Sequence, residues 1–202
     1  MTNRNTTLEV TMNDQERELK ILLNEQQAKQ LLNQIDFQKP RIQINTYYDN
    51  PRNFYKSKGI ALRIRQIVGD QENDQWILTI KKPLDAITKY EYEKSISAHT
   101  LEELSKEDIE WIESHIPFPN DLQVLASFKT ERWICDLEEA ELSLDHTYFK
   151  NSNDFEIEYE YKSSAASIQS FNSLLHSIDL KFTKNCPSKL ARAMQDQNHI
   201  DK

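Results

Sequence analysis

The chain has 202 residues, enough for one sizeable domain, and we expect a single domain over residues 1–202. Its formal net charge of −8 argues against general nucleic-acid binding, which needs an excess of Lys and Arg on one surface. Two glycines, Gly59 and Gly69, are too few for a Walker A loop or a dinucleotide fingerprint. Any phosphate group must therefore be bound by side chains.

The cysteines and the N-terminal residues predict the cellular compartment. Cys135 and Cys186 form neither a disulfide framework nor a metal-ligand pair, so reduced thiols are expected. Residues 1–9 are polar and lack the apolar region of a signal peptide. No run is long and apolar enough to span a bilayer. We expect a cytoplasmic protein without nucleic-acid or membrane partners, as a monomer or a homodimer.

The hydrophobic patterns predict an α+β fold dominated by antiparallel strands. Strands are expected over residues 8–23, 41–49, 60–68, 75–81, 89–97, 122–137, 140–149 and 155–161. Helices are expected over residues 24–35, over 100–115 as two helices that meet near residue 105, from 163 or 164 to 178, and after 187. Thr100 followed by Glu103 is a capping-box signature at the start of the second helical stretch. The helices should pack outside the strands.

The strands carry ionisable side chains on one face and apolar side chains on the other. In the first strand, Glu16, Glu18 and Lys20 share one face, and Leu19 lies on the opposite face. The alternation recurs with Arg63 and Arg65, with Glu91 and Glu93, and with Glu156, Glu158 and Glu160. One such strand would normally turn its charges to solvent. Because some strands carry only Arg and others only Glu, a closed barrel with a polar lumen is favoured.

A lumen lined by these faces would hold two sets of charges. The acidic set is Glu16, Glu18, Glu91, Glu93, Asp145, Glu156 and Glu158, and the basic set is Lys20, Arg63, Arg65, Lys81, Arg132, Lys189 and Arg192. Burying so many charges is costly unless a ligand compensates for them. Arg and Lys suit polyphosphate oxygens, and clustered carboxylates suit Mg²⁺ or Mn²⁺. The combination is typical of phosphoryl transfer.

These motifs resemble a known family. Glu16-x-Glu18-x-Lys20 is similar to the hallmark of the CYTH superfamily, or triphosphate tunnel metalloenzymes, and the chain resembles a bacterial cytosolic member of the adenylate cyclase and thiamine triphosphatase type. The family order continues through Tyr47-Tyr48-Asp49, Leu62-Arg63-Ile64-Arg65, Thr79-Ile80-Lys81, Glu91-Tyr92-Glu93, Arg132, Asp145, Glu156-Ile157-Glu158 and Ser188-Lys189-Leu190-Ala191-Arg192. The resemblance covers residues 8–194. It implies an eight-stranded antiparallel β-tunnel with helices outside, a divalent metal and a triphosphate-containing substrate.

The residues and the resemblance together suggest roles. Mg²⁺ or Mn²⁺ would be held by Glu16, Glu18, Asp145, Glu156 and Glu158. Substrate would be bound by Lys20, Arg63, Arg65, Lys81, Glu91, Arg132, Lys189 and Arg192. Glu93 or Glu158 would orient the attacking water.

Three positions need a choice of face. Thr130 stands where many family members have a lysine, and Lys129 should face away from the lumen because it is one residue off. Alternation from Thr79 places Lys81, and not Lys82, in the lumen. Glu160 is expected at or beyond the tunnel mouth.

The expected activity is metal-dependent hydrolysis of a triphosphate with release of the terminal phosphate. Inorganic triphosphate is the favoured substrate, and thiamine triphosphate and nucleoside triphosphates stay open. One alternative is a class IV-type adenylate cyclase that makes cyclic AMP from ATP. Another is a non-catalytic module that binds polyphosphate or nucleotides.

Overall fold

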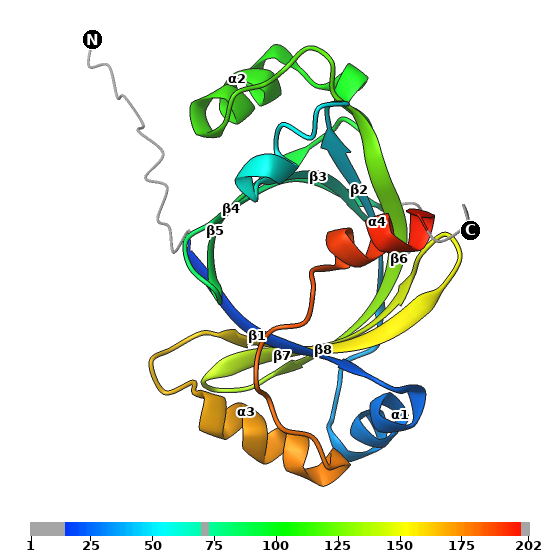
Figure 1. The fold of residues 1–202 in the computed structure, drawn as a ribbon, viewed down its shortest axis with the longest axis vertical. Coiled ribbons are helices and arrows are strands. Elements are labelled where there is room, and N and C mark those ends of the chain that lie inside the picture. Colours follow the sequence, from blue (N-terminus) through cyan, green and yellow to red (C-terminus); the bar gives the residue numbers. More distant parts are fainter. Residues whose placement is uncertain (1–14, 70–72, 199–202) are drawn as a thin grey trace.

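The described part of the chain folds into eight antiparallel strands that close into a barrel (Figure 1). The computed structural model describes residues 15–69 and 73–198. The order around the barrel is β1-β5-β4-β3-β2-β6-β7-β8. The strands are β1 (Gln15–Leu23), β2 (Arg41–Asp49), β3 (Ala61–Ile67), β4 (Gln75–Pro83), β5 (Thr88–Ile96), β6 (Gln123–Asp136), β7 (Ala140–Tyr148) and β8 (Asn153–Tyr161). The predicted α+β class and eight-stranded tunnel are confirmed.

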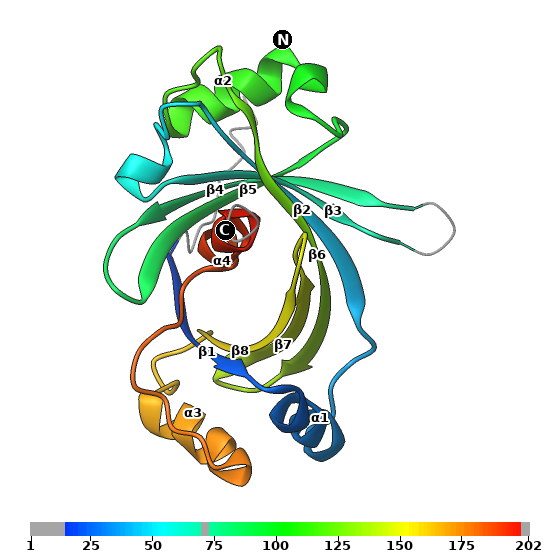
Figure 2. The ribbon, with the colours of Figure 1, turned by 45° about the vertical axis from the view of Figure 1, so that its right-hand side comes forward.

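Helices lie at the two outer sides of the barrel and at its opening. They are α1 (Glu25–Gln34), α2 (Lys106–His115), α3 (Ile168–Leu175) and α4 (Lys189–Asn198), with 3-10 turns η1 (Lys56–Lys58), η3 (Leu101–Glu103) and η4 (His176–Ile178). In Figure 1, α2 covers one side of the ring and α1 and α3 cover the opposite side. Figure 2 shows α4 in the opening of the barrel. Among the described helices, none combines the length and the apolar character that crossing a membrane requires.

The two larger apolar cores lie outside the barrel wall. Leu19, Leu144 and Tyr159 project from β1, β7 and β8 and share one core with Leu31 of α1 and Phe171 of α3. The second core joins the outer faces of β3 and β4 to α2, through Leu62, Leu78, Ile80 and Ile112. Successive strand residues point to opposite faces, so these outward apolar residues turn their charged neighbours into the lumen.

The strand register brings the charged inner faces of β1, β6, β7 and β8 side by side. Lys20 lies opposite Glu158 across the β1–β8 pair. Arg132 lies opposite Asp145 across β6–β7, and Asp145 lies opposite Glu156 across β7–β8. Directly opposed residues in antiparallel strands are close enough for their side chains to interact. Charges from four strands therefore meet inside the barrel.

Most element boundaries agree with the sequence predictions to within about two residues, as expected for boundary assignments. Residues 8–14 of the first predicted strand lie outside the described residues. The two helices that meet near residue 105 are confirmed, whereas one capping box and one helix start were predicted wrongly. Thr100 makes no capping hydrogen bond, and the capping box belongs to Ser105 and Asp108 at the start of α2. The backbone turns extended at Leu104, whose side chain is buried in the core under α2, so the Thr100 turn ends early. The third long helix begins at Ile168 with Ser167 as its cap.

Candidate active site

The barrel encloses a cavity of about 450 Å³ with a charged wall. Most of the charged residues singled out in the sequence line it. These are Glu16, Glu18, Lys20, Arg63, Arg65, Lys81, Glu91, Glu93, Arg132, Asp145, Glu158 and Lys189. Glu156 and Arg192 lie behind this wall, and the structure does not bring them to the cavity surface.

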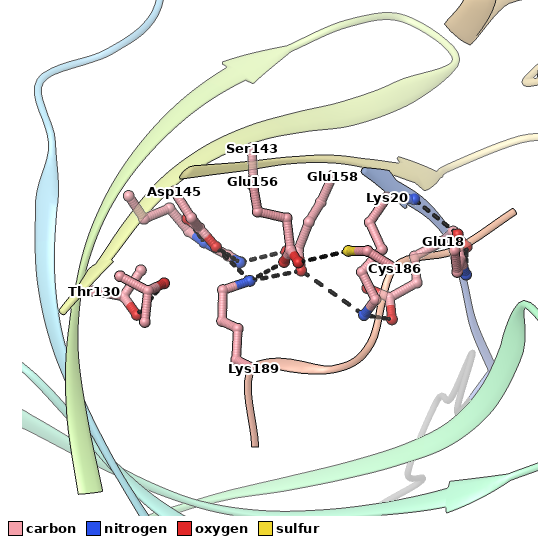
Figure 3. Close-up of polar contacts among 12 residues, drawn as sticks. Glu18, Lys20, Thr130, Ser143, Asp145, Glu156, Glu158, Cys186 and Lys189 are labelled. Carbon is pink, nitrogen blue, oxygen red and sulfur yellow. Dashed lines mark hydrogen bonds and ion pairs between the residues drawn. The ribbon is translucent and has the colours of Figure 1, made fainter. Parts of the chain in front are cut away.

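Three carboxylates converge at one side of the cavity around a single ammonium group (Figure 3). Lys189 Nζ lies 2.8 Å from Asp145 Oδ2 and 2.8 Å from Glu158 Oε1, and it also donates to Glu156 Oε1. The three residues each offer one oxygen within 4.8 Å of the others. We call Asp145, Glu156 and Glu158 the acidic cluster. Its all-oxygen donor set suits Mg²⁺ or Mn²⁺, and a cationic group already stands among the donors, so the residues fit a divalent metal.

The other oxygens of the acidic cluster are also paired. Arg132 forms a fork on Asp145, with Nε 2.8 Å from Oδ1 and Nη2 2.6 Å from Oδ2, and it also reaches Glu158. Arg192 Nη1 donates to Glu156 Oε2 over 2.7 Å, and the Cys186 thiol donates to the same oxygen over 3.0 Å. Arg192 also pairs with Asp154. Arg192 therefore fixes α4 to β8 from behind the cavity.

The segment before α4 enters the barrel along β1. Lys20 N donates to Asn185 Oδ1 over 2.8 Å, and Asn185 Nδ2 donates to the Glu18 carbonyl over 3.0 Å. The Cys186 amide then donates to the Lys20 carbonyl. Beyond it, α4 packs Leu190 and Ala193 against Ala126 and Phe128 of β6. These contacts place Lys189 inside the tunnel, and the sequence patterns gave no signal for the role of Asn185.

A second set of ion pairs lies on β1, β4 and β5. Lys81 Nζ is 2.6 Å from Glu16 Oε2 and 3.0 Å from Glu91 Oε2. Lys20 and Lys89 each lie 2.6 Å from Glu18 Oε1. Lys89 was missed in the sequence, although its spacing of two from Glu91 places it on the same strand face.

The lysines for which the sequence analysis had to choose a face follow strand alternation. Lys82 Nζ lies outside the barrel and donates to the carbonyl of His115, while Lys81 lines the cavity. Lys129 pairs with Glu131 at 2.8 Å on the outer face, and Thr130 lines the cavity. Thr130 Oγ1 lies 3.3 Å from Thr147 Oγ1, so the position often held by a lysine is filled by a hydrogen-bonded hydroxyl.

Two arginines on β3 have donors without a carboxylate partner in the part of the chain that the structure describes. Arg65 Nε donates to Asn45 Oδ1 over 3.0 Å, and among the described ion pairs none includes Arg65. Burial, reinforced by Arg63 and Arg132, lowers the pKa of Arg65 to about 10. Arg63 Nη2 donates to Thr79 and lies 3.5 Å from Glu91 Oε1 and Glu93 Oε1, but among the described residues its buried Nε has no hydrogen-bond partner. A buried cationic donor without a partner is costly, so this part of the cavity favours an anion.

Tyr47 and polar residues of β2 complete the wall beside these arginines. Arg63 Nη1 donates to the Tyr47 hydroxyl over 3.4 Å, and the Tyr47 ring stacks on Phe128 with centroids 5.5 Å apart. Gln43 and Asn45 precede Tyr47 on the same face and also line the cavity. Their spacing of two was visible in the sequence, but uncharged polar residues carry a weaker signal than Arg or Glu.

The carboxyl groups of the acidic cluster have pKa values that are shifted in opposite directions. Burial raises the pKa of Glu158, but Lys189, Arg132 and Lys20 outweigh burial and hold it well below its ordinary value. Burial is the main cause that raises the pKa of Glu156. Burial also raises the pKa of Asp145, but Arg132 and Lys189 outweigh it and keep the net shift downward. Glu158 and Asp145 are therefore held as carboxylates, the form that binds a cation.

Glu160 lines the cavity, whereas the sequence placed it at or beyond the mouth. Burial, with the nearby Glu16, raises its pKa from 4.5 to about 7. The folded state therefore holds this proton more tightly than the unfolded chain does, and its stability falls as pH rises through about 4.5 to 7. Glu160→Gln cannot ionise and should be more stable than the wild type at about pH 8, with the difference vanishing below the ordinary Glu pKa. Denaturant unfolding across this pH range tests this, and a difference that grows toward acid pH would contradict it.

Comparison with known proteins gives a decisive match. The CYTH domain family model matches residues 14–188. The chain belongs to the CYTH family. It is 27% identical over 180 residues to a Bacillus subtilis protein named "Putative triphosphatase YjbK", which covers 84% of this chain and 90% of the relative.

Solved CYTH-like structures share the fold. A Hippeastrum protein, titled "Putative adenylyl cyclase HpAC1 from Hippeastrum reveals a dominant triphophatase activity", superposes with a TM-score of 0.70 at 20% identity. The match covers 90% of this chain and 95% of that one. A Bacillus halodurans structure titled a "putative adenylate cyclase" gives a TM-score of 0.65 at 22% identity and covers 88% of this chain and 96% of its own. These structures establish the shared barrel.

Proposed function

We propose that this CYTH protein is an Mg²⁺- or Mn²⁺-dependent triphosphatase that releases the terminal phosphate of a triphosphate-containing substrate. Inorganic triphosphate is the preferred candidate, ahead of thiamine triphosphate and nucleoside triphosphates. One observation carries the proposal. The donors of Arg63 and Arg65 that lack a carboxylate partner share a cavity with the acidic cluster. A bound anion would satisfy the arginine donors, and a divalent cation would satisfy the acidic cluster. The names of the Bacillus subtilis and Hippeastrum relatives, which mention triphosphatase activity, also support the proposal.

The basic residues would bind and orient the triphosphate. Arg63 and Arg65 present planar forks that match phosphate oxygens, and Lys81 adds a point charge from the neighbouring strand. Arg132 stands between the arginines of β3 and the acidic cluster, because β6 lies between β3 and β7 in the strand order and Arg132 pairs with Asp145. The anion would thus lie between β3 and the β7–β8 wall.

The carboxylates would serve the cation and the attacking water. Asp145, Glu156 and Glu158 would hold the metal, with Glu16 and Glu18 available on β1. A bound Mg²⁺ or Mn²⁺ supplies positive charge that stabilises the phosphate oxygens during phosphoryl transfer. Glu158, ionised and facing the cavity, can accept a hydrogen bond from the water and orient it. Glu93, held by Thr79 Oγ1 at 3.0 Å, offers a second acceptor.

A substrate panel tests the proposal. Protein with Mg²⁺ or Mn²⁺ is given inorganic triphosphate, thiamine triphosphate or ATP, and phosphate, pyrophosphate and cyclic AMP are measured. Phosphate from inorganic triphosphate is the expected result. Pyrophosphate with cyclic AMP from ATP would replace the triphosphatase with a cyclase. Tight binding without turnover would leave a non-catalytic binding module.

Neighbouring lysines give a matched pair of variants for this assay. Lys81→Met removes a cavity charge and should lower kcat/KM for triphosphate at least about tenfold. Lys82→Met removes the same charge from the outer face and should change kcat/KM less than about twofold, because solvent and salt screen charges outside the barrel from the lumen. Both variants are checked for folding by thermal unfolding. Equal effects of the two substitutions would contradict the assignment of Lys81 to the substrate site.

A further inference from the structure

The Lys189 ammonium stands where the acidic cluster would hold a cation. It contacts an oxygen of Asp145, of Glu156 and of Glu158. These are the same residues whose oxygens lie within 4.8 Å of one another (Figure 3). A metal bound by these oxygens would need the space and the charge that the ammonium now occupies. The ammonium and the metal therefore exclude each other.

We propose that Lys189 is a built-in counter-ion that a divalent metal must displace, and that this residue sets the metal affinity of the acidic cluster. The inference rests on the metal-dependent function proposed above. It also orders binding, because Lys189 becomes available to a phosphate oxygen only after the metal has taken its place.

The contacts explain why Lys189, and not a neighbouring cation, is the group that leaves. Arg132 is held by a two-point fork on Asp145 from the rigid barrel wall. Arg192 is tied to Asp154 and to the Pro187 carbonyl in addition to Glu156. Every polar contact described for Lys189 goes to the acidic cluster. Its flexible four-carbon stem lets the ammonium move while Arg192 keeps α4 in place.

The departing ammonium has somewhere to go. Lys189 lines the cavity, whereas Glu156 and Arg192 lie behind its wall. An ammonium released toward the cavity would be hydrated there until a phosphate oxygen binds to it. The metal would meanwhile take over the carboxylates, so the displacement exchanges partners and leaves no charge isolated.

The test is calorimetry with MnCl₂ alone, without any phosphate compound. Lys189→Met should bind Mn²⁺ at least about tenfold more tightly than the wild type, because the site no longer has to be vacated first. Lys189→Arg keeps a positive charge and should not tighten binding. Arg65→Met is the matched control, because it removes one positive charge from the same cavity without touching the acidic cluster. It should tighten binding less than about threefold, because the described partner of its guanidinium is Asn45 and not a residue of the acidic cluster.

The outcomes separate this inference from its alternatives. Equal or weaker Mn²⁺ binding by Lys189→Met would overturn it. Equal tightening by Lys189→Met and Arg65→Met would overturn it as well, since net charge alone would then explain the effect. These experiments measure metal binding and not turnover. A failed substrate panel would therefore leave the inference standing, and failure of the inference would leave the proposed triphosphatase activity standing.

A second measurement uses the wild-type protein and does not depend on any variant folding. The Lys189 amine is acetylated with a limiting amount of reagent, and mass spectrometry follows its modification with and without Mn²⁺. Mn²⁺ should speed labelling of Lys189 and leave the outer-face Lys82 unchanged. Slower or unchanged labelling of Lys189 at saturating Mn²⁺ would overturn the inference.

Discussion

Replacing Arg65 by methionine should weaken the binding of inorganic triphosphate by roughly 10- to 100-fold without destabilising the fold. A charge-assisted contact to phosphate is worth about 1.5–3 kcal/mol, and about 1.4 kcal/mol is a tenfold change in affinity. Arg65 gives up no ion pair when it is removed, since its described partner is the Asn45 side chain. The substitution should therefore separate binding from stability. KM or a calorimetric Kd, together with a denaturant midpoint, measures both.

Arg132→Met provides the contrast. Arg132 also lines the cavity, but its removal strips Asp145 and Glu158 of a buried partner. Breaking one side of a buried ion pair costs about 3–5 kcal/mol of folding stability. We expect Arg132→Met to lose both binding and stability, and Arg65→Met to lose binding alone. Wild-type triphosphate affinity in a folded Arg65→Met protein would show that the anion does not lie beside β3.

Glu156→Gln should abolish Mn²⁺ binding and lower the free energy of unfolding by about 3–5 kcal/mol. Glu156 is 0% exposed, and it accepts from Lys189 on one oxygen and from Arg192 and Cys186 on the other. The amide keeps the shape but removes the charge, so two buried cations lose their shared partner. Calorimetry with Mn²⁺ measures the first effect and denaturant unfolding the second.

Glu131→Gln is the control for this substitution. Glu131 lies on the outer face of β6 and pairs with Lys129 at 2.8 Å. Exposed pairs contribute less than about 1 kcal/mol, so stability should change little and Mn²⁺ binding not at all. Unchanged Mn²⁺ binding in a folded Glu156→Gln protein would remove Glu156 from the metal site.

The barrel and its charged lumen could be predicted because strands have a strict period of two. Arg63 and Arg65 alternate with Leu62 and Ile64, and the same rule correctly separated Lys81 from Lys82. The charged faces could be assigned to the lumen only when several strands were considered together. A single strand would have suggested solvent.

The arrangement of the C-terminal segment could not be predicted from local patterns. Lys189 and Arg192 are three residues apart on one helix, yet Lys189 reaches the cavity and Arg192 lies behind the wall. That difference depends on how Asn185 anchors the preceding segment to β1, a contact 165 residues distant in the chain. Likewise, Thr100 and Glu103 satisfy the capping pattern, but burial of Leu104 ends their turn and leaves the cap to Ser105.

The pairing of charges inside the lumen also exceeds what sequence can show. Composition indicated that basic and acidic groups would share the lumen. It could not show that Lys189 would contact three carboxylates while Arg65 would pair with none of the described ones. This asymmetry distinguishes a cation site on the β7–β8 wall from an anion site on β3. It depends on side-chain reach and register across strands that are far apart in the chain.

The most direct test of the account is phosphate release from inorganic triphosphate by the purified protein with Mg²⁺ or Mn²⁺. The account predicts release by the wild type, a loss of at least about tenfold in kcat/KM for Arg65→Met, and no release above background for Glu156→Gln. A folded wild-type protein that releases no phosphate from inorganic triphosphate with either metal would contradict the account.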